Sequence, residues 1–271
     1  PSWSATLDDL DYRNGLFYNQ FTDIPFSGKV TGNEQGSLKN GERVGDWVGY
    51  HDNGQLKFKQ NYKNGESYGA WVEYHENGQL GFKKSFKNGK MDGTWVGYRK
   101  NGQVSEISNF KNGKRHGALV SYRENGQLWF QFNYKNGEKD GTMLEYHKNG
   151  QLYLKSNYKD GKRNGTWVSY HDNGQLEFKG NHKNDERDGA LVSYRENGQL
   201  YLKSNYKDGK MDGTWVGYRE NGQLEFNLNY KNGGKDVAMV EYHENGQLYL
   251  KSNYKDGKRN GTWVSYYDNG Q

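Results

Sequence analysis

The sequence has no cysteine, only 2 prolines and few aliphatic residues. Without cysteine the chain can form neither a disulfide framework nor a thiolate metal site. No apolar run approaches the ~20 residues that a membrane-spanning helix needs. Only 31% of the residues are hydrophobic, so leucine, isoleucine, valine and phenylalanine are too few to fill a thick core.

Aromatic residues and glycine are abundant instead. Aromatic residues make up 15% of the chain and glycine occurs 38 times, which is too much aromatic content for a disordered chain. This composition favours a thin structure whose apolar layer is mostly tryptophan, tyrosine and phenylalanine. The net charge of +5 comes mainly from lysines interleaved with acidic residues, a pattern typical of soluble β proteins that block edge pairing.

One tripeptide, Asn-Gly-Gln, recurs at a fixed interval of 24 residues. It begins at Asn53, Asn77, Asn101, Asn125, Asn149, Asn173, Asn197, Asn221, Asn245 and Asn269. A fixed short period indicates a repeat architecture in which each unit packs on its neighbours. Asn-Gly between alternating segments predicts a two-residue type I′ hairpin turn, with positive φ at both residues.

One unit illustrates the expected hairpin. Residues 47–52 are β-branched and aromatic, and residues 55–62 alternate polar with apolar side chains, so both segments read as strands. Residues 63–65, Lys-Asn-Gly, begin a longer return loop that contains a second glycine, Gly69. The sequence therefore predicts an all-β fold, an elongated single-layer antiparallel β-sheet solenoid of 24-residue β-hairpin repeats.

A two-residue turn fixes which residues face each other. Trp47 would face Gln60, Gly49 would face Phe58 and Tyr50 would face Lys57. Because side chains alternate along a strand, one face would carry Trp47, Leu56, Phe58 and Tyr62. The other face would carry Val48, Tyr50, Lys57 and Lys59. The Gln60 position is often serine or glycine, which leaves room for the indole opposite.

The repeat pattern divides the chain into three parts. Residues 1–20 are expected to be an N-terminal leader segment with a small hairpin, and residues 21–44 a degenerate capping repeat. Residues 45–271 hold ten 24-residue repeats, of which the last is incomplete. Its final strand would leave an open edge for self-association.

Three residues depart from the repeat. Glu106 replaces an apolar residue, which predicts a bulge or register shift. Asp185 replaces a turn glycine, which is tolerable in a left-handed conformation. Val237 replaces the second glycine of the return loop, so that loop should have a different shape.

The pattern Phe58-x-x-x-Tyr62-Lys63-Asn64-Gly65-x-x-x-Gly69 resembles the MORN repeat. The Gly-x-Trp-Val-x-Tyr and Asn-Gly-Gln-Leu segments look closer still to the bacterial variant found in proteins labelled YwqK-family antitoxins. The resemblance covers residues 21–271. It implies a non-catalytic scaffold for protein–protein binding, with the antitoxin label implying a toxin as the partner.

The resemblance also implies a location. Related bacterial chains carry a signal peptide, and residues 2–6 are similar to the end of a signal cleavage site. We therefore expect a bacterial, exported protein in the periplasm or at the cell surface, with the cytoplasm as the alternative.

Histidine is the first candidate for chemistry, because five histidines occupy one repeat position: His51, His75, His147, His171 and His243. Copies two strands apart would lie on the order of 9–10 Å from each other, too far to share a zinc ion with its ~2 Å bonds. Arginine takes the same position in other repeats, which favours a solvated hydrogen-bond donor. We predict no metal, no cofactor and no catalytic residue, because every candidate side chain is periodic.

The strongest candidate for binding is the row of tyrosines with the variable residues expected opposite them. The predicted partner-binding residues are Tyr122, Trp129, Tyr146, Tyr153, Tyr194, Tyr201, Tyr242 and Tyr249. Tyrosine and tryptophan are enriched at interface hot spots. The alternative is that these rings serve only as cross-strand pairs, worth ~0.2–1 kcal/mol each.

Several partners fit such a surface. A protein, with a toxin as one example, is the first interpretation. The second is a glycan or an anionic lipid, bound through aromatic rows and loop lysines. Nucleic acid is disfavoured, because a net charge of +5 diluted by acidic residues provides no electrostatic footprint.

Overall fold

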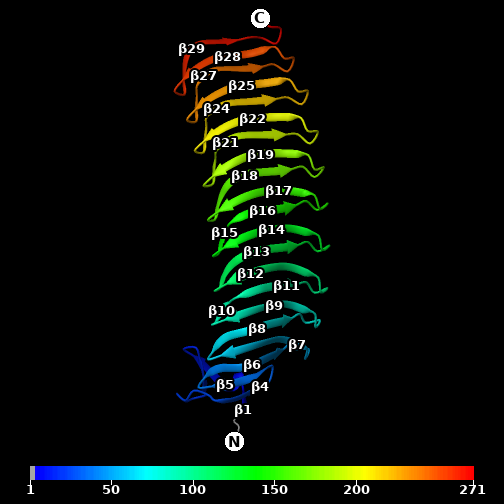
Figure 1. Cartoon of the computed structure of the whole chain (residues 1–271), viewed down its shortest axis with the longest axis vertical. Coiled ribbons are helices and arrows are strands. Elements are labelled where there is room, and N and C mark those ends of the chain that lie inside the picture. The colour runs from blue at the N-terminus through cyan, green and yellow to red at the C-terminus, as the bar shows by residue number, and fades with distance from the viewer. Residues whose placement is uncertain (1–3) are drawn as a thin grey trace. The chain divides into compact units, whose positions relative to one another are not determined.

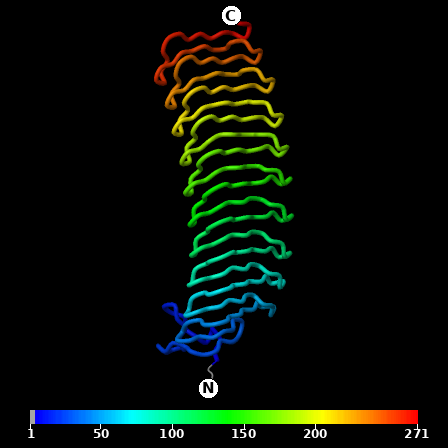
Figure 2. Tube along the Cα trace, in the orientation of Figure 1, coloured from blue at the N-terminus to red at the C-terminus, as the bar shows by residue number. Residues whose placement is uncertain are grey.

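The computed structural model describes residues 4–271 and divides into two compact units. Unit 1 holds the residues up to Leu128 together with Asn133–Glu138, and unit 2 holds Trp129–Phe132 and Lys139–Gln271. Figure 1 labels the strands of both units, and the trace in Figure 2 shows that successive hairpins of a unit follow the order of the chain. Ser2 and Trp3 of the expected leader lie outside the described residues.

Unit 1 begins with one 3-10 helix and continues as strands. Its elements are β1 (Ser4–Thr6), η1 (Leu7–Asp9), β2 (Leu10–Arg13), β3 (Leu16–Asn19), β4 (Gly28–Thr31), β5 (Glu34–Lys39), β6 (Glu42–Tyr50), β7 (Leu56–Lys63), β8 (Glu66–Tyr74), β9 (Leu80–Lys87), β10 (Lys90–Met91), β11 (Gly93–Tyr98), β12 (Val104–Lys111) and β13 (Lys114–Tyr122). From β4 to β9 each strand pairs antiparallel with the next, β10 and β11 both pair with β9, and β11, β12 and β13 pair in order. β1 is the exception, because it pairs parallel with β4.

Unit 2 repeats the same hairpins. Strands β14 (Leu128–Lys135) and β15 (Glu138–Lys139) contain residues of both units. The others are β16 (Gly141–Tyr146), β17 (Leu152–Lys159), β18 (Lys162–Tyr170), β19 (Leu176–Lys183), β20 (Glu186–Arg187), β21 (Gly189–Tyr194), β22 (Leu200–Lys207), β23 (Lys210–Met211), β24 (Gly213–Tyr218), β25 (Leu224–Lys231), β26 (Gly234–Lys235), β27 (Val237–Tyr242), β28 (Leu248–Lys255) and β29 (Lys258–Ser265). No helix within residues 4–271 could cross a bilayer. The predicted all-β fold of antiparallel hairpin repeats is confirmed.

The Asn-Gly-Gln turn differs from the predicted type I′ turn. Gly54 has a φ of 79°, whereas Asn53 is not among the residues with positive φ. The amide of Gly54 donates to the carbonyl of His51, and the amide of His51 donates to Gln55, both at 2.8 Å. This is a three-residue loop, a type I turn followed by a left-handed glycine. The side chain of Asn53 contributes, because its Oδ1 accepts from the amide of Gln55 at 3.0 Å.

The two-residue type I′ turn lies at the other end of the hairpin. Asn64 and Gly65 have φ values of 49° and 74°, and the flanking residues Lys63 and Glu66 pair directly. The expected return loop is therefore wrong: the chain turns tightly and continues as strand β8. Gly69, at φ 68°, marks a bulge within that strand instead of a loop.

The longer Asn-Gly-Gln loop changes the predicted register by one residue. Trp47 pairs with Gln60 and Gly49 with Phe58, as predicted. Tyr50 pairs with Leu56, so the predicted pairing of Tyr50 with Lys57 is wrong. A β-bulge between Gly49 and Tyr50 absorbs the extra residue, and the same shift recurs between β11 and β12 and throughout unit 2.

One side of each unit, which we call the ring face, carries the aromatic residues at the positions of Trp47, Phe58 and Tyr62. The rings of Trp47 and Tyr62 lie 6.2 Å apart, and Trp215 contacts both Phe226 and Tyr230. The predicted sharing of one face by these three positions is confirmed, whereas Leu56, predicted on the same face, pairs with Tyr50. Small residues fit beneath the rings as expected, since a Cβ on Gly36 would lie 2.3 Å from the indole of Trp47.

Only one of the three sequence departures behaves as predicted. Asp185 adopts a left-handed φ of 71°, as expected. Glu106 causes no additional bulge, because it pairs with Gly97 in the usual register and forms an ion pair with Arg115 at 3.6 Å. Val237 keeps a φ of 64° like the glycines at its position, so the predicted change of loop shape is wrong and the valine is strained.

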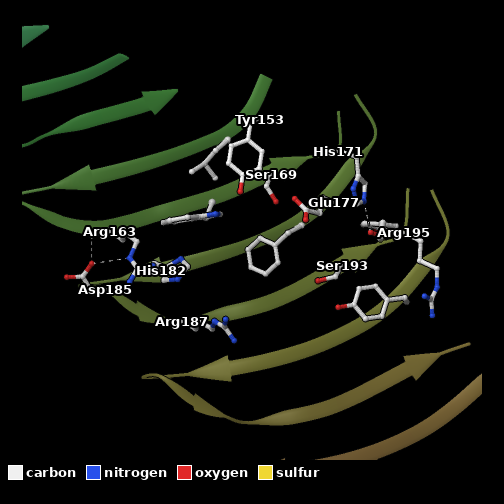
Figure 3. Close-up of a pocket in the computed structure, with 15 residues that line it drawn as sticks. Tyr153, Arg163, Ser169, His171, Glu177, His182, Asp185, Arg187, Ser193 and Arg195 are labelled. Atoms are coloured by element: carbon white, nitrogen blue, oxygen red, sulfur yellow. Dashed lines mark hydrogen bonds and ion pairs between the residues drawn. The ribbon is translucent and has the colours of Figure 1, made fainter. Parts of the chain in front are cut away.

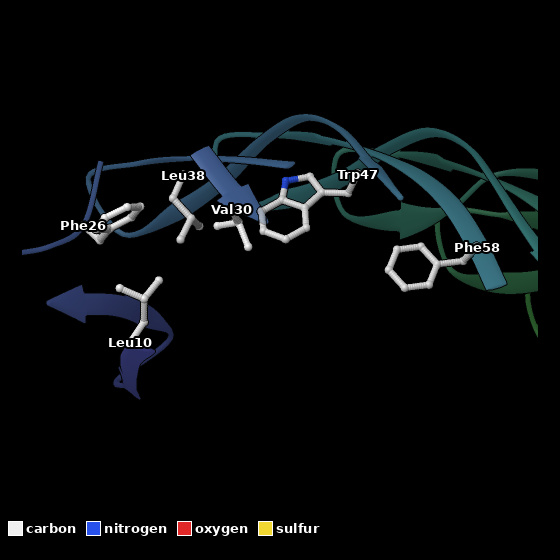
Figure 4. Packing of buried hydrophobic residues seen from close by; sticks show 6 residues of the cluster. All are labelled: Leu10, Phe26, Val30, Leu38, Trp47 and Phe58. Carbon is white, nitrogen blue, oxygen red and sulfur yellow. The ribbon is translucent and has the colours of Figure 1, made fainter. Parts of the chain in front are cut away.

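The N-terminal residues of unit 1 cover the first strands of the sheet. Residues 10–19 form a separate two-stranded hairpin of β2 and β3. Its buried Leu10 belongs to a core with Phe26, Val30, Leu38 and Trp47 (Figure 4). Trp47 is completely buried. This second layer buries the N-terminal strands in a hydrophobic core between two layers.

Successive repeats are also joined by side chains just before each Asn-Gly-Gln turn. His51 Nε2 lies 2.9 Å from the carbonyl of Tyr74 in the next repeat, and Arg99 Nη2 donates to Tyr122 in the same way at 2.6 Å. The predicted role of this position as a hydrogen-bond donor is confirmed.

The hydrogen bond made by the asparagine of each Asn-Gly-Gln turn depends on whether the preceding donor is histidine or arginine. Where the donor is histidine, the asparagine Nδ2 donates to the next repeat, as from Asn149 to the carbonyl of Asp172 at 2.6 Å. Where the donor is arginine, the asparagine donates to the glutamine of its own turn, as from Asn221 to Gln223 at 2.9 Å.

Replacing Val237 with glycine should stabilise the protein. Glycine adopts a φ of 64° without the side-chain clash that costs other residues roughly 1–2 kcal/mol. We expect a higher midpoint of denaturation in guanidinium chloride. The matched control is Gly69→Val at a φ of 68°, which should lower it by a similar amount. An unchanged or lower midpoint for Val237→Gly would contradict the strain.

Replacing His147 with arginine should move a hydrogen bond. We expect Asn149 to leave the carbonyl of Asp172 and donate to Gln151, as the asparagines beside arginine do. One bond replaces another, so stability should change by less than about 1 kcal/mol. A crystal structure of the variant checks this, and an asparagine still bonded to Asp172 would refute the coupling.

Candidate functional site

The predicted binding residues occupy two repeat positions, the variable position equivalent to Lys57 and the constant tyrosine position equivalent to Tyr50. The variable residues are exposed, with Trp129 at 41%, Tyr153 at 38%, Tyr201 at 40% and Tyr249 at 45% of their surface. The tyrosines of the constant row are half-buried: Tyr122, Tyr146, Tyr194 and Tyr242. The variable row is therefore the one that presents rings to solvent.

Three of the four predicted pairs of these rings are absent from the strand register. Tyr146, Tyr194 and Tyr242 pair with Leu152, Leu200 and Leu248 instead of the expected tyrosines. Tyr122 belongs to unit 1 and Trp129 to unit 2. The variable rings contact the donor position that precedes each turn: Tyr153 lies 4.9 Å from His147, Tyr249 lies 4.9 Å from His243, and Arg195 lies over Tyr201 at 5.2 Å.

The bulge places the variable position on the ring face rather than with the constant tyrosines. Two successive residues, Trp129 and Phe130, contact each other with ring centroids 4.9 Å apart. In a regular strand successive side chains point to opposite faces. In unit 1, a Cβ on Gly97 would meet both Trp95 and the hydroxyl of Ser105, which occupies the variable position. The prediction that this position lies on the face opposite the large rings is wrong.

The ring face of unit 2 contains a hollow of about 800 Å³. It spans strands β17 to β22 (Figure 3). Its lining combines aromatic, charged and hydroxyl side chains: Tyr153, Leu154, Arg163, Trp167, Ser169, His171, Glu177, Phe178, His182, Asp185, Arg187, Ser193, Tyr194, Arg195 and Tyr201. The hollow brings together three of the predicted residues, Tyr153, Tyr194 and Tyr201, and leaves the other five outside it.

Gly180 lies next to the hollow. It is buried and pairs with Trp167, and a Cβ on it would lie 3.1 Å from Cζ of Phe178; the side chains of Trp167 and Phe178 both line the hollow. The equivalent residue in unit 1 is Lys84, whose ammonium lies 3.8 Å from the ring centroid of Trp71 and 4.7 Å from that of Phe82. Burial lowers the pKa of Lys84, while the charge of Glu73 opposes the shift. The same space is thus filled in one repeat and open in the other.

One end of the hollow is basic. Arg163, His182, Asp185 and Arg187 gather there (Figure 3). Asp185 accepts from the backbone amide and Nε of Arg163 at 2.9 and 3.3 Å. These bonds hold the pKa of Asp185 below its ordinary value, the backbone bond contributing most. Arg163 also lies over the ring of Trp167 at 5.1 Å.

His182 lies at the floor of this basic end. Its side chain is only 8% exposed and its Nδ1 has no hydrogen-bond partner. Burial lowers the pKa of His182, the positive charges of Arg163 and Arg187 lower it further, and Asp185 opposes them. The imidazole is therefore neutral near pH 7 and the potential around it is positive.

The opposite end holds Glu177, His171 and Arg195 (Figure 3). His171 contacts the carbonyl of Tyr194 at 3.0 Å, and Arg195 donates to the carbonyl of Tyr218 at 3.0 Å. Within residues 4–271, no three histidine, aspartate or glutamate side chains lie close enough together to hold a metal ion. The arrangement offers flat apolar surfaces between two groups of charges, which suits recognition of a ligand.

A family model described as MORN repeat variant matches ten segments: residues 43–64, 68–88, 91–112, 115–136, 139–160, 163–184, 187–208, 211–232, 235–256 and 259–271. These segments cover most of the chain. The chain belongs to the MORN repeat variant family. MORN repeats are in general non-catalytic binding modules, and this chain is a repeat scaffold.

Searches for individual relatives add little to this MORN assignment. A search of curated proteins found no match. Among solved structures, the TcdB2-TccC3-Cdc42 complex matches at 14% identity over 86% of this chain, with a TM-score of 0.19. The Tc holotoxin pore of Photorhabdus luminescens matches at 11% identity over 82%, with a TM-score of 0.22. This chain spans only 17% and 15% of those chains, and such low TM-scores carry no conclusion about it.

Sequence reasoning missed the centre of this MORN site. Gly180, His182 and Asp185 each differ from the usual residue at their repeat position, and all three fall within one unit. Three departures from the repeat pattern within one 24-residue repeat were the signal that could have indicated the site. A search restricted to tyrosines could not find it, because the hollow depends on a missing side chain.

Replacing His182 with tyrosine, the residue at that position in the next repeat, should reduce acid sensitivity. The unfolded chain binds a proton at the ordinary pKa of 6.5, whereas the folded protein resists protonation. The stability of the MORN protein is therefore fully present above pH 6.5 and is lost as the pH falls toward the lower folded pKa. Urea denaturation above and below that pH should show a flatter profile for the variant. Parallel profiles would contradict the assignment to His182.

Proposed function

We propose that the chain binds a protein partner through the ring face of unit 2, with the hollow at Gly180 as the centre of the interface. The observation that carries this proposal is the hollow itself. It combines about 800 Å³ of open space with the half-exposed rings of Tyr153 and Tyr201. Large amphipathic rings around a concave centre are typical of interface hot spots.

The scaffold around the hollow favours a binding role. Strand β18 pairs with β19 from Gly165 to Tyr170, and β19 pairs with β21 at Phe178 and Lys179, so the rings are held in place before a partner arrives. Preorganised side chains lose little conformational entropy on association. Variation at exposed positions of an otherwise repeated scaffold provides specificity without changing the fold.

A toxin is the partner that the antitoxin-type resemblance suggests. Its support is the Gly-x-Trp-Val-x-Tyr and Asn-Gly-Gln-Leu segments of the repeats, such as residues 165–170 and 173–176. In that role the scaffold would neutralise the toxin by holding it, without chemistry of its own.

Filling the hollow tests the proposal. The immobilised chain is used to capture a partner from extracts of the native host, and the purified partner is then titrated against variants. Gly180→Leu should lower the affinity by about 2 kcal/mol or more, as loss of a hot spot does. Leucine occupies the same position at Leu228, where it is buried, so the variant should fold.

The matched control is Tyr249→Ala, outside the lining of the hollow, which should bind normally. If Gly180→Leu binds with unchanged affinity, the hollow is not the interface.

Glycans are the second candidate ligand for the aromatic surface. Binding to a glycan array that Gly180→Leu abolishes, with no protein captured, would replace the protein by a sugar ligand.

A further inference from the structure

Arginines of the ring face are paired with glutamates in unit 1. Arg43 forms an ion pair with Glu34 at 2.9 Å, and Arg115 with Glu106 at 3.6 Å. Each glutamate lies nine positions before its arginine, on the neighbouring strand. Glu34 and Glu106 both occupy the repeat position equivalent to Phe58. A carboxylate at this position therefore lies on the ring face.

Unit 2 keeps the arginines and lacks these glutamates. Leu154 stands nine positions before Arg163, and Phe178 nine positions before Arg187. Arg163 forms an ion pair with a different acid, Asp185, at 3.3 Å. Asp185 stands where other repeats have a turn glycine. Arg187 donates to the hydroxyl of Tyr206 at 3.1 Å and lies over its ring at 5.2 Å. Within residues 4–271, no carboxylate forms an ion pair with Arg187.

The surroundings of Arg187 favour an anion. Arg187 pairs across the strands with His182, whose Nδ1 is buried without a partner. Arg163 contributes a second positive charge at the same end of the hollow (Figure 3). Asp185 is already bonded to Arg163 twice, which leaves the guanidinium of Arg187 as the cation without an acidic partner.

We infer that the basic end of the hollow receives an acidic side chain of the protein partner, whose carboxylate pairs with Arg187. The partner's carboxylate would take the place that Glu34 and Glu106 take in unit 1. The apolar part of the same partner segment would lie on Trp167 and Phe178, which line the hollow beside it. This inference rests on the proposed function, because it names what the interface recognises.

The experiment uses the full chain and a phage-displayed library of random linear peptides. Peptides selected on the wild-type protein should be enriched in aspartate or glutamate beside an apolar residue. Exchanging the acid of a selected peptide for its amide should weaken binding about tenfold or more, as for loss of a charged hydrogen bond.

Two variants address the site directly. Arg187→Met should weaken binding to the same degree, and methionine is native at this position in Met91 and Met211. Phe178→Glu copies Glu106 and should block the site, because the chain would supply the carboxylate itself. The control Arg259→Met changes the equivalent arginine outside the hollow, where it lies over Trp263, and should leave binding unchanged.

The outcomes separate this inference from the proposed function. Peptides that bind wild type, fail on Gly180→Leu and show neither acidic enrichment nor dependence on Arg187 would overturn the inference alone. Failure to select any peptide that depends on the hollow would overturn both. Binding to vesicles containing phosphatidylglycerol, lost in Arg187→Met and with no acidic peptide selected, would assign the anion to a lipid and also overturn the inference.

Discussion

The three-residue turn that ends in a left-handed glycine is the constraint on which the ring face depends. Such a turn closes each Asn-Gly-Gln hairpin through the amide–carbonyl bonds seen at His51, Gly54 and Gln55. It leaves one strand a residue longer than its partner, and the bulge absorbs the difference. The second turn, a type I′ turn such as that at Asn64 and Gly65, pairs its flanking residues directly, and a second bulge at Gly69 follows within β8. Alternation of the two turns keeps every repeat in the same register.

The bulge has a functional consequence. It turns the variable residue of each repeat onto the face that already holds the rings, so that Tyr153 and Tyr201 border the same hollow as Trp167 and Phe178. A flat hairpin would have divided these side chains between two faces. A repeated geometry and variable side chains therefore meet on one surface. Next to the hollow stands Gly180, where the equivalent residue in unit 1, Lys84, lies over Trp71.

Charge distinguishes the repeats more than shape does. In unit 1 the arginines are neutralised by acids of the chain, as in the pair of Arg43 and Glu34. In unit 2 the acid of the equivalent position is replaced by Leu154 and Phe178. Burial lowers the pKa of the neighbouring His182, and the charges of Arg163 and Arg187 add to this effect. Within residues 4–271, Arg43, Arg115 and Arg163 thus pair with acids of the chain while Arg187 has no ion pair, and an unpaired charge of this kind is expected at a recognition site.

The sequence was sufficient to predict the fold class, the pairing of Trp47 with Gln60 and the common face of the large rings, because these follow from period and alternation. It was insufficient for the turns. Asn-Gly serves two geometries, and the choice depends on the hydrogen bond from the Gln55 amide to Asn53, which composition does not reveal. The misread turn shifted the register after Gly49 and put Tyr153 on the wrong face. The hollow was missed for another reason, since it requires knowing which side chains from six strands border it.

The most direct test of the bulged register is an NMR measurement of contacts between neighbouring rings in one strand. Selectively labelled protein should show nuclear Overhauser effects between the ring protons of Trp129 and Phe130, whose centroids are 4.9 Å apart. The same should hold for His147 and Tyr153 across the turn, also at 4.9 Å. Absence of both effects would mean that side chains alternate regularly through this stretch, and the variable residues would then not belong to the ring face.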